Sequence, residues 1–211
     1  MKTILCYGDS NTHGYNPKGG RFPRDVRWTG RLQQMFGEDA YVVEEGLNGR
    51  TTVWEDPIEG YKSGLSYLVP CLYTHSPIDI FVLMLGTNDL KNRFHLTAAE
   101  IASGCRTLIE TVQTTTLLSQ GYLPKILLIS PMLVPEEING HAFGDMFIGE
   151  DCEERSLMFA KYYKQVAKET GCEFMDAAEY VAVSTKDYLH MDAEGHERFA
   201  KAVYEKLREM L

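Results

Sequence analysis

Short apolar runs alternate along the chain with longer segments in which apolar residues recur every three or four positions. The runs predict five strands, at Thr3–Tyr7, Tyr41–Glu44, Ile80–Leu85, Ile126–Ser130 and Glu173–Met175. The third and fourth runs, IFVLML and ILLIS, are apolar on both faces. A strand of this kind is typical of a parallel sheet whose two sides are both covered by helices.

The segments between the strands carry the periodicity and end signals of helices. One apolar stripe formed by Trp28, Leu32 and Phe36 ends at Gly37. A second helix is predicted to begin at Thr97, because Thr97 and Glu100 have the spacing of a capping box. A third stripe follows Asp192 to the end of the chain.

Two helices have less regular signals. Asp151–Glu154 resembles a cap, and predicts a helix that ends at Gly171. Pro70 interrupts the apolar pattern of Leu65, Leu68 and Leu72, and predicts a kink or a late helix start.

Five strands that alternate with helices predict a three-layer α/β/α fold with a parallel sheet. Right-handed crossovers and the strand number favour the flavodoxin-like order 2-1-3-4-5. We expect a single domain over residues 1–211, since no linker or repeat divides the sequence. The longest irregular segment is Pro131–Gly149, a candidate pocket wall or interface, because loops of this length are often functional.

Charge and cysteine content exclude several classes of protein. The net charge of −9 disfavours binding to nucleic acid or to an anionic membrane. The five cysteines form no CxxC pair, so we expect reduced thiols rather than disulfides or zinc ligands. The apolar run after Met1 is too short for a signal peptide and no segment is long enough to span a membrane, so the cytoplasm is the expected location.

Polar residues gather where the predicted strands end. Ser10 follows the first strand, Gly49 the second, Asn88 the third, and Asp187 and His190 the last. Ligands of open parallel sheets bind at this edge. A serine, a histidine that takes its proton and an aspartate that orients the histidine are the parts of acyl-transfer chemistry. A glycine backbone N–H and an asparagine amide could stabilise the oxyanion.

His196 competes with His190 for the role of base, since Asp192 and His196 form a second Asp/His pair. Their spacing puts them on one face of the terminal helix, where a surface interaction is expected. Asp187 and His190 precede that helix, as residues entering a strand-end site should, so we favour His190.

Four sequence blocks together resemble the SGNH, or GDSL-type, hydrolases, a family of serine esterases and lipases with a flavodoxin-like fold. The blocks are Gly8-Asp9-Ser10, the Gly49 loop, Gly86-Thr87-Asn88-Asp89, and Asp187-x-x-His190. Around them, DVRWTG, EEGLNGRTT and MLGTND are similar to the bacterial arylesterase/acyltransferase subgroup, some members of which also perform perhydrolysis. Assembly into homo-oligomers also occurs in that subgroup.

The resemblance implies that Ser10 is the nucleophile, His190 the general base and Asp187 the residue that orients it. It also implies an oxyanion hole made by the N–H groups of Ser10 and Gly49 and by the side chain of Asn88. The chain departs from the pattern at Asn11, where the family usually has leucine. It also departs from an acyltransferase-like member at Tyr15 and Gly49, where that member has tryptophan and alanine. These differences affect how well the site excludes water, and therefore whether alcohols or peroxide can accept the acyl group in place of water.

We therefore expect a serine esterase that hydrolyses short-chain aryl or alkyl esters through an acyl-enzyme, and that needs no cofactor or metal. Residues near the predicted site are candidate substrate contacts: Asn11, Tyr15, Trp54, Thr87, Met132 and Leu189. Two alternatives stay open, a carbohydrate O-acetyl esterase with the same triad and a flavin- or phosphate-binding module, because flavodoxins share the predicted topology.

Overall fold

The computed structural model describes residues 1–211 and contains a five-stranded, all-parallel sheet of order β2-β1-β3-β4-β5. The strands are β1 (Lys2–Gly8), β2 (Ala40–Gly46), β3 (Ile80–Met84), β4 (Lys125–Ser130) and β5 (Glu173–Asp176). Each overlaps the strand predicted from the apolar runs, and the predicted order is confirmed. Because all five strands are parallel, their carboxyl ends lie at the same edge of the sheet.

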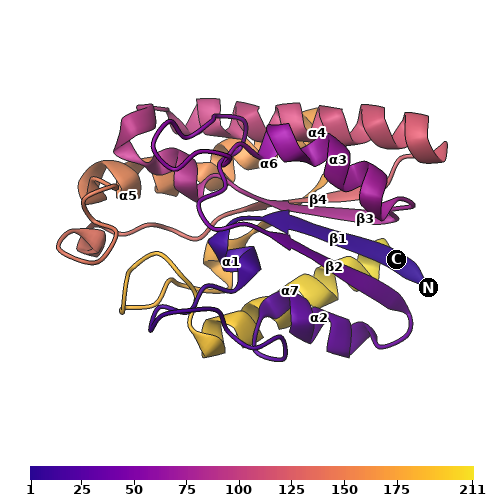
Figure 1. Ribbon diagram of the computed structural model, residues 1–211, viewed down its shortest axis with the longest axis horizontal. Coiled ribbons are helices and arrows are strands. Elements are labelled where there is room, and N and C mark those ends of the chain that lie inside the picture. Colours follow the sequence, from indigo (N-terminus) through magenta and orange to yellow (C-terminus); the bar gives the residue numbers. More distant parts are fainter.

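Helices cover both sides of the sheet, as the apolar strands predicted (Figure 1). On one side lie α3 (Gly64–His75), α4 (Ala98–Gln120) and α6 (Phe159–Thr170). On the other lie α2 (Trp28–Phe36) and α7 (Ala193–Met210). Each side encloses its own cluster of buried apolar residues, and the fully buried Trp28 belongs to the second cluster.

The strand register brings together loops that carry the predicted site residues. Gly8, at the end of β1, pairs with Gly46 of β2 on one side and with Met84 of β3 on the other. The loops that leave these three strands therefore begin side by side. The short helix α1 (Ser10–His13) lies directly at this edge, and both chain termini lie at the opposite edge (Figure 1).

Three helix boundaries agree with their sequence signals. Gly37 ends α2, the Thr97–Glu100 capping box is formed at the start of α4, and the carboxylate of Asp192 caps α7. These ends satisfy backbone groups that a helix leaves without partners.

The prediction of one helix from Asp151 to Gly171 is wrong in two respects: the helix begins earlier, and it is divided into two helices. Helix α5 (Gly149–Leu157) begins before Asp151, and Ile148 precedes it without a side-chain cap. The carboxylate of Asp151 pairs instead with Arg155, one turn further along. Met158 then separates α5 from α6, because its N–H bonds to Arg155 in a tighter turn. Side-chain spacing alone does not distinguish a cap from an i,i+4 pair.

The late helix start predicted at Pro70 is also wrong. Helix α3 begins at Gly64, capped by Ser63, and continues through Pro70 to His75. Proline removes the N–H that would bond to the carbonyl one turn earlier. Both Pro70 and Ser66 are exposed, so this carbonyl lies on the solvent side of the helix. Loss of one bond is tolerated there because Leu68, Cys71 and Leu72 anchor the opposite face in the core.

None of the helices combines the length and apolar character needed to cross a bilayer. All five cysteines are free thiols, four of them buried and Cys172 partly so. Short 3₁₀ turns complete the structure at Thr87–Leu90 (η1), Asn92–Phe94 (η2), Glu136–Ile138 (η3) and Ala177–Glu179 (η4).

Candidate active site

Ser10 is the first residue of α1, immediately after the end of β1. The carboxylate of Asp9 caps this helix by accepting a hydrogen bond from the N–H of Asn11 at 2.9 Å. Burial raises the pKa of Asp9 to about 6, although the Asn11 hydrogen bond acts in the opposite direction. Asp9 therefore shapes the turn that presents Ser10, and has no contact with the serine hydroxyl in this structure.

The close approach of α1 to the strand ends depends on a glycine. A Cβ atom at Gly46 would lie 2.1 Å from the backbone nitrogen of His13. Any side chain at this position would therefore push α1, and Ser10 with it, away from the sheet.

The structure joins Ser10, His190 and Asp187 by two hydrogen bonds. Nδ1 of His190 lies 2.7 Å from Oδ2 of Asp187, and Nε2 lies 2.9 Å from Oγ of Ser10. Burial alone would raise the pKa of Asp187, but the hydrogen bond and charge of His190, with the amides of Leu189 and His190, hold it below its ordinary value. An ionised Asp187 can only accept, so Nδ1 of a neutral imidazole carries the proton and Nε2 accepts from Ser10.

Asn11 connects the two ends of this arrangement. Its Nδ2 donates to the carbonyl of Leu189 at 3.3 Å, and its Oδ1 accepts from the N–H of Met191 at 3.0 Å. These bonds hold the segment on either side of His190 against α1. Asn11, predicted as a substrate contact, instead links the histidine segment to the serine turn.

Gly49 lies in the loop after β2 with a φ of +81°. Its N–H has no acceptor within the protein, and the residue lines the same cavity as Ser10. A left-handed backbone favours glycine. The position suits a donor to an oxyanion.

Asn88 is held beside that loop by η1, which follows β3. Its Nδ2 donates to the carbonyl of Arg50 at 3.2 Å, which leaves its second amide hydrogen for a ligand. Arg50 in turn donates to the carbonyls of Gly8, at 3.0 Å, and Glu45, and its guanidinium stacks on the ring of Tyr7 at 4.1 Å. Arg50 thus joins the Gly49 loop, Asn88 and the end of β1.

Asp89 holds the loop that follows Gly49 through hydrogen bonds to Thr52. Its buried carboxylate accepts from the N–H of Thr52 at 3.0 and 3.1 Å and from the Thr52 hydroxyl. Burial raises the pKa of Asp89 to about 7, against the lowering effect of the Thr52 hydrogen bonds. Asp89 therefore joins η1 to the loop that contains Thr52.

Ser10 and His190 open onto a cavity of ≈ 110 Å³. On one side the ring of Tyr15 lies 4.3 Å from the imidazole of His190, and that of Phe143 lies 5.3 Å from it. The cavity is lined by Ser10, Tyr15, Asn48, Gly49, Glu59, Asn88, Lys91, Phe143, Met146, Phe147, Leu189 and His190. The segment Pro131–Gly149 therefore supplies part of the pocket wall, through Phe143, Met146 and Phe147.

Of the candidate substrate contacts, the structure brings Tyr15 and Leu189 to the cavity and leaves four outside it. Asn11 has the linking position described above. Trp54 is 41% exposed, Thr87 is buried within η1, and Met132 is packed in the core beneath α2 and α7. The two charged residues of the cavity, Glu59 and Lys91, were not predicted, because both belong to residue types that are common on protein surfaces and neither lies within the four sequence blocks.

The surface interaction predicted for His196 is wrong. His196 is fully buried, and its Nδ1 accepts from the N–H of Trp28 at 3.3 Å. Burial lowers the pKa of His196 to about 4. The carboxylate of Asp192 is used for the helix cap, where it accepts from the N–H of Gly195 at 2.8 Å.

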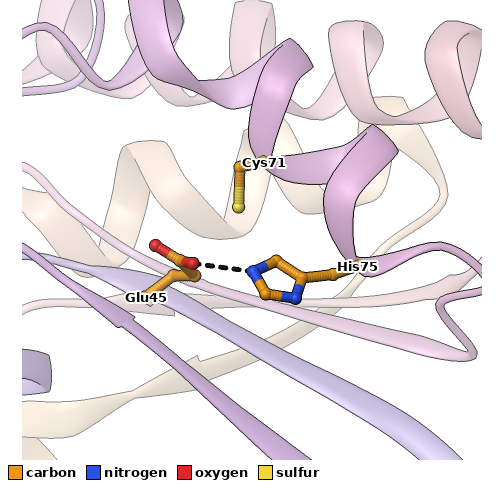
Figure 2. A group of neighbouring side chains, drawn as sticks. All are labelled: Glu45, Cys71 and His75. Atoms are coloured by element: carbon orange, nitrogen blue, oxygen red, sulfur yellow. Dashed lines mark hydrogen bonds and ion pairs between the residues drawn. The ribbon is translucent and has the colours of Figure 1, made fainter.

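A second group of ionisable side chains lies beneath α3, where Glu45, Cys71 and His75 converge (Figure 2). Their donor atoms lie within 4.8 Å of one another, and Nε2 of His75 donates to Oε1 of Glu45 at 2.7 Å. The sequence analysis did not predict this group.

Such a donor set could hold a divalent cation, but its surroundings favour the hydrogen bond between His75 and Glu45 instead. Burial raises the pKa of Cys71 to about 12, so a cation would have to displace a tightly held proton. The guanidinium of Arg50 is close enough to act on the same thiol, and it would repel a cation. The group therefore anchors α3 to β2.

Comparison with known proteins agrees with this geometry. The profile of the GDSL-like lipase/acylhydrolase family matches residues 6–198. The chain belongs to this family. It is accordingly a carboxylic ester hydrolase of the GDSL type. A search of curated protein sequences gave no match.

Solved structures of esterases are similar over the whole chain. An inhibitor-bound aryl esterase from M. smegmatis has 36% identity and a TM-score of 0.93, with 100% of both chains covered. Est24, a carbohydrate acetylesterase from Sinorhizobium meliloti, has 32% identity and a TM-score of 0.92, again over 100% of both chains. A putative arylesterase from Agrobacterium tumefaciens has 33% identity, 100% coverage of both chains and a TM-score of 0.90.

Proposed function

We propose that this GDSL-type hydrolase cleaves short-chain aryl or alkyl esters, with Ser10 as nucleophile, His190 as base and Asp187 as the group that orients it. The observation that carries the proposal is the continuous hydrogen-bonded series from Ser10 through His190 to Asp187 at the edge of a small cavity. A serine hydroxyl needs a neutral acceptor within hydrogen-bond reach, and Nε2 of His190 meets that need.

The reaction begins when Ser10 Oγ attacks the ester carbonyl and its proton passes to His190 Nε2. Asp187 stabilises the imidazolium that forms. The N–H groups of Ser10 and Gly49 and the amide of Asn88 donate to the oxyanion. His190 then gives the proton to the leaving oxygen, and an acyl-Ser10 ester remains.

Water, activated by His190, attacks the acyl-enzyme in the second half of the reaction and releases the acid. An alcohol or hydrogen peroxide at the same position would give a new ester or a peracid instead. Transfer would therefore use the same residues, with only the second nucleophile changed.

The dimensions and lining of the cavity favour small acyl groups. Its volume of ≈ 110 Å³ leaves little space, and Phe147, which lines it, is fully buried. The rings of Tyr15 and Phe143 beside His190 offer apolar faces to the part of the substrate that leaves.

Replacement of the nucleophile tests the assignment. Ser10→Ala should lower kcat on phenyl acetate by roughly 10⁴-fold or more, with an unchanged circular dichroism spectrum. A serine-directed phosphonate should label the wild-type peptide that contains Ser10 and leave the variant unlabelled. Full activity in Ser10→Ala, or label at another serine, would refute the proposal.

Carbohydrate O-acetyl esters are a second candidate substrate class, because Est24 is similar over its full length. The catalytic residues would be the same, and only the alcohol would differ. A kcat/KM on acetylated sugars above that on phenyl acetate would select this class. We find no observation that favours the flavin- or phosphate-binding module.

We also propose the partners, the location and the assembly of the enzyme. Its substrate is a small molecule, and the net charge of −9 disfavours nucleic acid and anionic membranes as partners. We propose a cytoplasmic location and self-association of the chain, the latter because Ile58 and Tyr61 expose large apolar side chains to solvent.

A further inference from the structure

The cavity next to Ser10 has two chemically different sides. Tyr15, Phe143 and Leu189 form an apolar side around His190. Asn48, Glu59 and Lys91 form a polar side around Gly49 and Asn88, next to the apolar Met146 and Phe147. A site for simple alkyl esters needs no charged pair, so the polar side calls for an explanation.

The charged residues of the polar side form a neutralised cluster. Lys91 Nζ, with only 2% of its side chain exposed, pairs with Glu59 Oε1 and with Asp56 Oδ2 at 3.5 Å. Arg93 pairs with the same two carboxylates, at 3.2 Å from Glu59 and 3.5 Å from Asp56. Two cations therefore balance two anions, and the cluster adds no net charge beside a developing oxyanion.

One oxygen of the cluster has no partner. Glu59 Oε1 takes both the Lys91 and Arg93 contacts, whereas Glu59 Oε2 makes no hydrogen bond within the protein. A methyl group on Gly49 would lie 2.7 Å from Oε2, so this oxygen lies beside the glycine of the oxyanion hole. The side chain of Glu59 is 31% exposed, which leaves Oε2 accessible from the cavity.

The chemistry of the reaction places the substrate between the two sides. The leaving oxygen must lie next to Nε2 of His190, because it receives its proton from there. The carbonyl oxygen must lie at Gly49 and Asn88. The remaining substituent of the carbonyl carbon, the acyl group, then extends past Gly49 into the rest of the cavity, which Glu59, Lys91, Met146 and Phe147 line.

We propose that Glu59 Oε2 accepts a hydrogen bond from a hydroxyl on the acyl group, and that the enzyme prefers esters of short hydroxy acids over alkyl esters of equal size. This inference rests on the proposed function of Ser10 and His190. An alkyl terminus at the same place would remove water from a carboxylate oxygen and give no hydrogen bond in return. A hydroxyl would replace that water with a charge-assisted bond.

The test compares two esters that differ by one hydroxyl. Phenyl glycolate and phenyl propionate place a hydroxyl and a methyl group, respectively, at the same point of the acyl chain. The measured quantity is the ratio of their kcat/KM values, which we expect to fall about tenfold from wild type to Glu59→Ala, the size expected for one hydrogen bond to a charged group. Glu59→Gln, which keeps an acceptor and is the milder change, should give a smaller fall.

Glu55→Gln is the matched control. Glu55 lies in the same loop, accepts from the N–H of Lys62 at 2.9 Å and does not line the cavity, so its ratio should equal that of wild type. An equal fall in Glu55→Gln would show that loop disorder, not Glu59, sets the ratio, and would overturn the proposal.

Two further outcomes would overturn it. One is an unchanged ratio in folded Glu59→Ala that still hydrolyses phenyl acetate. The other is a Glu59-dependent preference for 2-hydroxyethyl acetate over propyl acetate, with no preference between phenyl glycolate and phenyl propionate. Glu59 would then bind a hydroxyl on the alcohol part of the ester rather than on the acyl group. Failure of the wild-type enzyme to hydrolyse phenyl acetate would instead count against the proposed function.

Discussion

His190 and His196 are close neighbours in the sequence, yet their surroundings give them different properties. Nδ1 of His190 donates to Asp187, and its Nε2 accepts from Ser10. His196 accepts from Trp28, so its Nε2 carries the proton of the neutral ring, and that atom is buried without a partner. The edge of its ring contacts Phe22, at a centroid distance of 5.3 Å. His196 is therefore a core residue that stays neutral.

Alanine substitutions should separate the two roles. His190→Ala should lower kcat by roughly 10³-fold or more and leave the fold intact. His196→Ala should retain most of the activity of the folded enzyme and lower the free energy of unfolding by about 2–4 kcal/mol, because it leaves a cavity. Urea unfolding and phenyl acetate turnover measure the two quantities. The reverse pattern would show that His196 is the base.

Titration of Asp89 should make the free energy of unfolding depend on pH. Its pKa of about 7 in the fold exceeds the value of about 3.9 in an unfolded chain. The folded state thus holds the proton more tightly, and stability falls as pH rises between these two values. Asp89→Asn cannot titrate and should escape this fall.

Urea unfolding at pH 5 and pH 8 tests that expectation. The free energy of unfolding of Asp89→Asn minus that of wild type should be larger at pH 8 than at pH 5, because only wild type loses stability as the pH rises. A difference that is the same at both pH values would mean that Asp89 does not titrate in this window.

At the scale of elements, the active site is a junction of loops that different strands supply. The serine turn follows β1, the glycine loop follows β2, η1 follows β3, and the histidine segment follows β5. Side chains rather than secondary structure hold these loops together. Asn11 joins the first to the last, and Asn88 and Asp89 join the third to the second.

Removal of the Asn11 side chain should disturb this junction without touching the substrate. Asn11→Ala leaves the carbonyl of Leu189 and the N–H of Met191 without partners, so His190 should lose its fixed position. We expect kcat to fall by about 10–100-fold with little change in KM, since small misplacements of a catalytic group are costly.

Asn16→Ala provides the comparison, because Asn16 caps an exposed turn at Lys18 and has no bond to the histidine segment. Its kcat should match that of wild type. A raised KM with normal kcat in Asn11→Ala would indicate that Asn11 contacts substrate after all.

At the scale of the whole molecule, the loop after Gly49 has an unusual surface. Tyr61 is 94% exposed, Ile58 is 75% exposed and Trp54 is 41% exposed. Three large apolar side chains within one short loop are costly to keep in water, and clustered exposure of this kind is typical of interfaces. We expect copies of the chain to associate through this loop.

Sedimentation velocity can test the association directly. The wild-type chain should sediment as a species larger than 211 residues, and Ile58→Asp combined with Tyr61→Asp should shift it to the monomer. Leu118→Asp is the matched control, because Leu118 is 78% exposed on α4 and outside the loop. A monomeric wild-type protein would exclude the association.

The architecture and the candidate catalytic residues could both be predicted from the order of apolar runs and from the residues that follow them. Apolar runs such as Ile80–Met84 require burial on both sides, and this requirement leaves a covered parallel sheet. Parallel strands then deliver their following loops to one edge, so Ser10, Gly49, Asn88 and His190 could be expected to meet before any contact was known. The resemblance to GDSL-type hydrolases gave the same residues.

Only the tertiary structure decided how each polar side chain is used. Asn11 and His196 depend on partners far away in the sequence, Leu189 and Trp28, and no local spacing reveals such partners. The cavity is likewise built from segments that meet only after folding, so Glu59 and Lys91 could not be assigned to it in advance. Hydrophobic periodicity is a local property of the chain, whereas hydrogen bonds, burial and charge neutralisation are set by whatever the fold brings within a few ångströms.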